Sequence, residues 1–234
     1  MKLYTKLARL YDEMYQHIFD YDAQASLVDS ILKQQGARTV LEVGCGSGHL
    51  AKRLQQKGYA VTGVDLNEEM VEIAREHAKD VMFLRGDMRS LDLKRTYDAV
   101  VVLGRGFTYM TTNEDANAAL ASFYRLLKKG GVLVFDNFDA KKTLTSNHDG
   151  VREFDLEGKQ VKRSTHTELK LDDAVCWLWK ANYEITAGGK TTYVEDESLL
   201  RSFFKSELEL LLQHNRFKVI DFRRDDFLLV VAQK

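Results

Sequence analysis

The chain has 234 residues, of which 44% are hydrophobic and 29% are charged. This composition is that of a globular protein and excludes collagen-like, disordered and disulfide-scaffold classes. Its 34 lysines and arginines nearly balance 35 aspartates and glutamates, and the net charge of −1 gives no electrostatic reason to expect nucleic acid as a partner.

The apolar runs and the cysteines indicate neither a membrane-spanning segment nor a disulfide framework. The longest apolar runs, residues 99–103 and 227–232, are much shorter than the roughly 20 residues that a membrane-spanning helix needs. Asp12 interrupts the segment in which a signal peptide would have its apolar core. Cys45 and Cys176 lie in unrelated contexts, without metal-ligand spacing. We therefore expect a cytoplasmic protein with reduced thiols, no membrane association and no metal.

The N-terminal 36 residues are rich in aromatic side chains and have helical character. Tyr11 and Tyr15 are four residues apart, which places them on one side of a helix. They are interpreted either as a packing stripe or as lid residues that close over a ligand. We predict a helical lid over residues 1–36.

Short β-branched runs alternate with longer helical periodicity from residue 38 onward. This alternation predicts βαβ units and a parallel sheet. The predicted strands are residues 39–43, 59–64, 81–84, 97–103 and 131–137, and the predicted helices are residues 48–57, 67–78 and 114–128.

The pattern changes after residue 137. Hairpin turn signals separate four alternating runs, which predict an antiparallel meander inserted into an α/β domain. Those runs are residues 152–156, 160–170, 175–186 and 191–195. A helix over 206–214 and strands over 217–222 and 227–232 then follow, and the short link between these strands favours antiparallel pairing. We predict one domain over 1–234, with a cofactor-binding core over 37–138 and 200–234 and an insertion over 150–196.

A glycine-rich turn, Glu42-Val-Gly-Cys-Gly-Ser-Gly48, joins the first strand to the first helix. Glycines allow a ligand to lie against bare backbone, and the helix N-terminus offers unpaired amide donors. The Gly-x-Gly-x-Gly spacing has His49 where a dinucleotide fingerprint needs glycine, so nicotinamide and flavin dinucleotides are disfavoured. Asp65 ends the second strand, where a carboxylate can bind a ribose diol. Asp87 and Met88 follow the third strand and are suited to a purine.

With these residues the chain resembles the class I S-adenosylmethionine-dependent methyltransferases, over about residues 38–134 and the terminal strand pair. The resemblance implies a seven-stranded Rossmann-like sheet with an antiparallel last strand, helices on both faces, and the inserted four-stranded antiparallel meander. The layout is most similar to small-molecule N-methyltransferases of the amino-sugar and glycine type. The cofactor implied is S-adenosyl-L-methionine, with S-adenosyl-L-homocysteine as its product. The predicted cofactor-binding residues are Tyr11, Glu42, Gly44, Cys45, Gly46, Gly48, Asp65, Leu66, Asp87, Met88 and Leu103.

The acceptor is expected beyond the carboxyl ends of the fourth and fifth strands, because ligands of open parallel sheets bind at that edge. Arg105 is interpreted either as a contact for a carboxylate or phosphate or as a surface ion pair. Trp177 and Trp179 share one face of an inserted strand, which either docks the meander or forms a pocket wall. The predicted acceptor-binding residues are Tyr15, Arg105, Phe107, Tyr109 and Asn137.

The function predicted is methyl transfer to a small-molecule acceptor, most simply at nitrogen. A neutral amine needs mainly to be positioned, whereas a hydroxyl needs a base. His148 and His166 are the candidate bases in the insertion, and each is also explained as a solvated residue. The alternatives are O-methylation, or a binding protein for S-adenosylmethionine or a nucleoside that lacks transfer activity. A homodimer is allowed, and the catalytic residue is left open.

Overall fold

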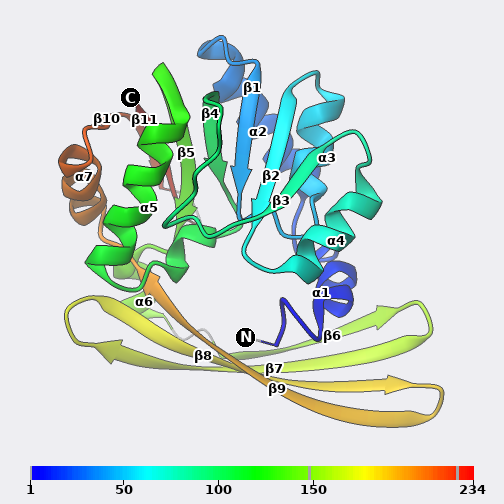
Figure 1. The fold of residues 1–234 in the computed structure, drawn as a ribbon. Helices are drawn as coiled ribbons and strands as arrows, with labels where there is room; N and C mark the ends of the chain where they lie inside the picture. Colours follow the sequence, from blue (N-terminus) through cyan, green and yellow to red (C-terminus); the bar gives the residue numbers. More distant parts are fainter. Residues whose placement is uncertain (1, 147–148, 225–226) are drawn as a thin grey trace.

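Two β-sheets of different topology organise the chain in the computed structural model, which describes residues 2–146, 149–224 and 227–234 (Figure 1). The larger sheet has seven strands in the order β10-β11-β5-β4-β1-β2-β3. Their bounds are β1 Thr39–Val43, β2 Ala60–Asp65, β3 Met82–Arg85, β4 Tyr97–Val102, β5 Leu127–Asn137, β10 Lys218–Arg224 and β11 Leu228–Gln233. β11 pairs antiparallel with both β5 and β10, and the pairings among β1 to β5 are parallel. The predicted antiparallel last strand and fold class are confirmed.

Helices cover both faces of this sheet, as its burial on both sides requires. On one face, α5 (Asn113–Leu126) and α7 (Lys205–His214) insert Phe123 and Leu208 into a cluster with Phe135. On the other face, α2 (Tyr21–Gln34), α3 (His49–Gln56) and α4 (Glu68–His77) form a second cluster that includes Val28 and Leu54. The two clusters hold the strand ends in fixed positions.

The smaller sheet lies across the edge at which the parallel strands end (Figure 1). Its four antiparallel strands are β6 Gly150–Leu156, β7 Lys159–Leu171, β8 Val175–Ala187 and β9 Lys190–Ser202, in that order. The predicted meander is therefore present, but β9 continues to Ser202 where the sequence predicted an end at Glu195. The continuation carries polar inward residues such as Asp196 and Ser198, so apolar alternation does not mark it.

The N-terminal segment packs against the inner face of the smaller sheet. Leu3 and Met14, from the turn before α1 (Ala8–Tyr15) and from α1 itself, form a separate hydrophobic cluster with Phe154, Val161 and Tyr183. The predicted lid thus consists of two parts with different roles. Residues up to about 19 lie between the sheets, whereas α2 belongs to the core.

Two short helices follow strands β4 and β5 and were not predicted. They are the 3₁₀ helix η1 (Gly106–Tyr109) and the helix α6 (Ala140–Thr145). Within the described ranges, no helix is long and apolar enough to cross a membrane.

Candidate functional site

The turn between β1 and α3 lies where the strand order reverses, since β1 has β2 on one side and β4 on the other. Gly44, Gly46 and Gly48 have φ of 71°, 53° and 79°, values that favour glycine. A Cβ atom on Gly46 would meet no atom within 4 Å. The backbone of this turn is therefore bare toward the space in front of it.

Gly48 has a different role from the other two glycines. A Cβ atom there would come within 2.8 Å of the Ala74 Cβ and 2.9 Å of the Phe83 Cζ. Its missing side chain allows α3 to pack closely on α4 and β3. Gly48 was predicted to bind the cofactor, but it does not line the cavity described next.

A cavity of about 420 Å³, the loop cavity, opens in front of the glycine turn. Its volume lies within the range of small-molecule sites, about 300–1,000 Å³. Residues 197–199 of β9 also line it, in the stretch that the sequence did not predict as strand. The predicted cofactor-binding residues that line it are Tyr11, Glu42, Gly44, Cys45, Gly46, Asp65, Leu66, Asp87, Met88 and Leu103.

Glu42 is a buried carboxyl with one unpaired oxygen at the base of the loop cavity. It is 4% exposed, and its Oε2 has no hydrogen-bond partner among the described residues. Burial, and secondarily the charge of Asp65, raises the pKa of Glu42 to about 8. A cationic ligand group at this oxygen would satisfy it and favour its ionised form.

Asp65 and Asp87, the other two predicted acids, are already held by this chain. The Asp65 carboxylate accepts from the backbone N–H of Gly46 and of Asn67, at 2.9 Å each, so it fixes the glycine turn. Burial raises its pKa. Asp87 accepts from the Arg89 Nε at 3.0 Å, and that hydrogen bond lowers the pKa of Asp87. Each carboxylate retains lone pairs for a ligand.

Aromatic side chains separate the loop cavity from a second cavity. We call Tyr4, Tyr11, Phe19 and Tyr109 the aromatic partition, because all four line both cavities. The hydroxyls of Tyr4 and Tyr109 are hydrogen-bonded at 2.7 Å, which ties the N-terminal segment to η1. Tyr11 also stacks on Tyr15 with the ring centroids 4.0 Å apart. The packing interpretation of the two tyrosines is therefore confirmed, and their role as lid residues stays a prediction.

The second cavity, the sheet cavity, measures about 370 Å³ and lies between the partition and the smaller sheet. Tyr15, Arg105 and Tyr109, three of the predicted acceptor-binding residues, line it. Trp177 and Trp179 also line it, and Trp179 in addition packs against the cluster that docks the meander, so both interpretations describe this face. Farther along the same face of β8, Ala181 and Tyr183 dock the meander on the N-terminal segment.

Phe107 and Asn137 do not line either cavity, contrary to the prediction that they contact the acceptor. Phe107 is fully buried, with its ring centroid 5.0 Å from that of Phe135. Alternation along β5 points Asn137 to the same face as Phe135, away from the cavities. Phe107 therefore lies in the core cluster behind the site, and Asn137 is fully buried on the face of the sheet that this cluster covers.

The sequence interpretation missed several residues that line the cavities. Tyr4 and Phe19 reach the site only because the N-terminal segment folds under the sheet. Arg152 and Arg163 share the inward face of their strands with Phe154 and Val161. The sequence does carry a signal for these arginines, because each is a charged residue at an inward position of an alternating strand.

No histidine lines either cavity within the part of the chain that the structure describes. His166 is exposed and pairs with Asp149 at 2.9 Å, while His148 lies outside the described residues. Burial raises the pKa of Tyr4, Tyr11 and Tyr109, so these phenols remain protonated near neutral pH. Burial also raises the pKa of the Cys45 thiol. These groups can donate hydrogen bonds, but they are not poised to remove a proton.

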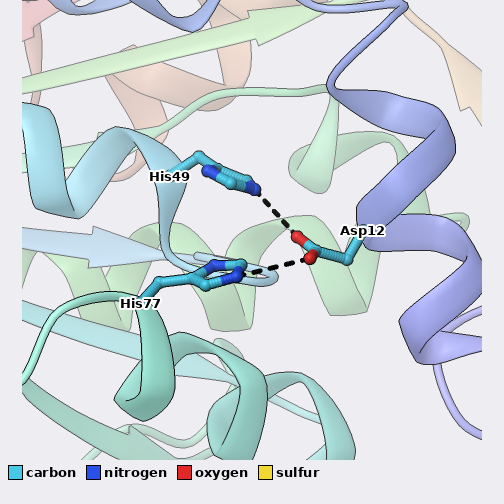
Figure 2. Close-up of side chains that lie close together, drawn as sticks. All are labelled: Asp12, His49 and His77. Carbon is cyan, nitrogen blue, oxygen red and sulfur yellow. Dashed lines mark hydrogen bonds and ion pairs between the residues drawn. The ribbon is translucent and has the colours of Figure 1, made fainter. Parts of the chain in front are cut away.

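A buried clasp joins the N-terminal helix to the core next to the glycine turn. Figure 2 shows the rings of His49 and His77 converging on the Asp12 carboxylate, with Nε2 atoms 2.8 Å and 3.4 Å from its oxygens. The Nδ1 of His77 bonds to the carbonyl of Ser47 in the turn at 2.9 Å. Burial raises the pKa of Asp12, but hydrogen bonds from His49 and Ser47 outweigh burial and lower it overall. One ligand atom from each of the three lies within 4.8 Å of the others, so the same group could hold a metal ion.

Asp12→Asn is expected to loosen α1 from the core. Losing a buried charged hydrogen-bond acceptor costs about 1–3 kcal/mol, so amide exchange in residues 8–15 should accelerate roughly 5- to 150-fold. Arg9→Met is the matched control, because the Arg9–Glu76 pair joins α1 to α4 at the surface, as the Asp12–His77 contact does inside, with 65% and 53% of the side chains exposed. Hydrogen-exchange mass spectrometry measures both. Equal protection of α1 in the two variants would contradict the role of the clasp.

Comparison with known proteins gives matches over most of the chain. The family described as "Methyltransferase domain" matches residues 40–131. A protein of Geobacillus sp. (strain WCH70) named "Putative methyltransferase" is 36% identical in an alignment that covers 86% of this chain and 98% of that relative.

The names of two further matches also state an acceptor. The dTDP-3-amino-3,4,6-trideoxy-alpha-D-glucopyranose N,N-dimethyltransferase of Streptomyces venezuelae is 27% identical over 193 residues, which cover 81% of this chain and 80% of that protein. CalS10, an amino pentose methyltransferase from Micromonospora echinaspora solved with bound SAM, superposes with a TM-score of 0.83 at 22% identity. That match covers 96% of each chain and shows a shared fold.

Proposed function

The chain belongs to the class I S-adenosylmethionine-dependent methyltransferases, and on that premise we propose that it methylates a nitrogen atom of a small-molecule acceptor. The observation that carries this proposal is the pair of adjoining cavities. One lies against bare glycine backbone, and the other lies beyond the aromatic partition. A methyl donor and an acceptor need two adjacent binding sites of this kind.

The residues around the loop cavity fit S-adenosylmethionine. The unpaired Glu42 Oε2 suits the ammonium of the methionine part, and the open space at Gly46 leaves room for a ligand against the main chain. Asp65 at the end of β2 would accept from the ribose hydroxyls, and Asp87 with Met88 would hold the adenine. When bound, the cofactor supplies an electrophilic methyl carbon whose bond to sulfur breaks as the acceptor lone pair attacks, leaving neutral S-adenosylhomocysteine.

The chain's own contribution is to position the acceptor and to exclude water. The partition brings the two cavities together at Tyr11 and Tyr109. Fixing a nucleophile in line removes much of the entropic barrier of a bimolecular reaction. A neutral amine needs no base before it attacks, which agrees with the absence of a poised base among the described lining residues. The name of the Streptomyces venezuelae relative, an N,N-dimethyltransferase, also supports nitrogen.

Titration calorimetry with S-adenosylhomocysteine tests the donor site. The wild-type protein is expected to bind it, and Asp65→Ala should bind about 1–3 kcal/mol more weakly because the ribose hydrogen bonds are lost. The substitution also frees the Gly46 N–H, which adds to the loss. Binding of NAD in place of S-adenosylhomocysteine, or an unchanged affinity in Asp65→Ala, would refute the assigned site.

A labelled-methyl assay over amines, amino sugars and phenols tests the acceptor. Label is expected on amines, and the reaction should proceed without added metal. Transfer to phenols alone would replace nitrogen with oxygen as the acceptor atom. A protein that binds S-adenosylhomocysteine but labels nothing in a broad metabolite extract would be a binding protein instead of an enzyme.

A further inference from the structure

The sheet cavity carries an excess of positive charge. Three arginines line it: Arg105 from the turn before η1, Arg152 from β6 and Arg163 from β7. The described residues around this cavity include one carboxylate, that of Asp149. It is engaged elsewhere, because it accepts from the Thr167 N–H at 2.7 Å and pairs with His166.

Arg152 and Arg163 face each other directly across the β6 and β7 pairing. Like charges at opposed positions destabilise a sheet. Alternation with Phe154 and Val161 turns both arginines inward, toward the cavity. The fold therefore keeps two guanidinium groups together at a place where they repel each other.

The guanidinium of Arg163 is buried and that of Arg105 is half-buried, and both stack on aromatic rings. Burial raises the pKa of the nearby Asp136 to about 6, and the charge of Arg105 opposes that rise. Arg163 is 9% exposed, its Nε has no hydrogen-bond partner among the residues that the structure describes, and it lies over the Trp179 ring, 5.9 Å from the centroid. Arg105 lies over the rings of Phe19 and Phe138 at 4.9 Å and 5.4 Å. Neither arginine forms an ion pair within 4.0 Å with any residue in the described ranges. Stacking occupies the guanidinium faces and leaves N–H edges to bind an oxyanion.

The backbone of Arg105 has a left-handed conformation that hydrogen bonds fix in place. Its φ of 67° lies in the left-handed region, which is rare for a residue with a side chain and is typical of functional sites. The Arg105 N–H donates to the Asp136 Oδ1 at 2.7 Å, and the Arg105 carbonyl accepts from the Thr108 hydroxyl at 2.6 Å. These contacts fix the turn beside the partition.

We propose that the sheet cavity binds an anionic group of the acceptor, a phosphate or a carboxylate, through Arg163 and Arg105, with Arg152 adding charge at the rim. This inference rests on the proposed function, since it names the acceptor's chemical class. Holding the anion at the smaller sheet directs the rest of the acceptor toward the partition and the loop cavity. A buried guanidinium without a counter-ion is costly, and an anionic acceptor removes that cost when it binds.

Calorimetry with pyrophosphate, inorganic phosphate and succinate tests the proposal on the full chain loaded with S-adenosylhomocysteine. At least one probe should bind, and Arg163→Met should weaken its affinity by about tenfold or more. Lys162→Met is the matched control, because it removes the same charge from the exposed face of the same strand and should bind as the wild type does. Binding of the phosphates identifies a phosphorylated acceptor, and binding of succinate alone identifies a carboxylate.

The readouts separate this inference from the proposed function. If S-adenosylhomocysteine binds but no anion does, or if Arg163→Met and Lys162→Met bind the anion equally, the anionic acceptor is refuted and the methyltransferase is not. If S-adenosylhomocysteine itself fails to bind, the proposed function fails. Unchanged S-adenosylhomocysteine affinity in Arg163→Met shows that this variant is folded. Arg105→Met provides the second variant, with the same loss of anion affinity expected.

Discussion

Replacing Glu42 with glutamine is expected to stabilise the free protein at pH 7 and to weaken its binding of S-adenosylmethionine. In the native state burial raises the pKa of Glu42 to about 8, from 4.5 in an exposed chain. Between these values the unfolded state releases the proton and the native state keeps it. Stability therefore falls as pH rises, by about 1.4 kcal/mol per pH unit. Glutamine has the same shape and does not titrate, so the variant should gain about 3 kcal/mol at pH 7.

The pH dependence provides the decisive check on this prediction. At pH 4.5 the carboxyl is protonated in the native state and about half protonated in the unfolded state, so urea unfolding of the two proteins should nearly coincide. At pH 7 the variant should unfold at a higher urea concentration. Its affinity for S-adenosylhomocysteine should fall by about 1–3 kcal/mol, because the ligand ammonium loses its carboxylate. Equal pH slopes in the two proteins would contradict the assignment of this buried acid.

Gly48→Ala is expected to lose mainly stability and Gly46→Ala mainly ligand affinity, although both change a glycine of the same turn. At Gly48 the new methyl group would overlap Ala74 and Phe83, and the residue would keep its left-handed backbone. Left-handed strain of about 1–2 kcal/mol and overpacking of about 1–3 kcal/mol give a total destabilisation of roughly 2–5 kcal/mol. At Gly46 the methyl group would enter open space, so only the smaller strain applies.

Ligand binding should show the reverse order. The Gly46→Ala methyl group projects toward the loop cavity and should reduce S-adenosylhomocysteine affinity, whereas folded Gly48→Ala should retain most of it. Urea denaturation and calorimetry on the same samples measure both effects. If Gly46→Ala bound the ligand normally, the bare backbone would not be the contact surface proposed here.

The parallel core was predictable because its signals are local. Strands and helices show their own periodicities along the chain. The glycine turn and the acids at positions 42, 65 and 87 each lie at the end of a predicted strand or directly after it. Strand order then brings them to one edge without further information. For this reason the predicted cofactor-binding residues, except Gly48, line one cavity.

The acceptor side was harder to predict because its walls come from distant parts of the chain. The hydrogen bond between Tyr4 and Tyr109 joins residues 105 positions apart, and no periodicity reports such a contact. Asn137 was misplaced because one step along a strand reverses the side-chain direction. Arg163 was not identified, although it alternates with the inward-facing Val161 on the same strand.

The cluster of Leu3 and Met14 with Phe154, Val161 and Tyr183 bears on how acceptor preference can be exchanged among relatives. The module above the donor is encoded in two pieces, residues 2–18 and 150–202, that are far apart in the gene yet interlock through their apolar side chains. A chimera that grafts the later piece alone would join mismatched halves and leave apolar surface uncovered. Transplanting both pieces together keeps the interlock intact and leaves the glycine turn and the acids at positions 42, 65 and 87 in place.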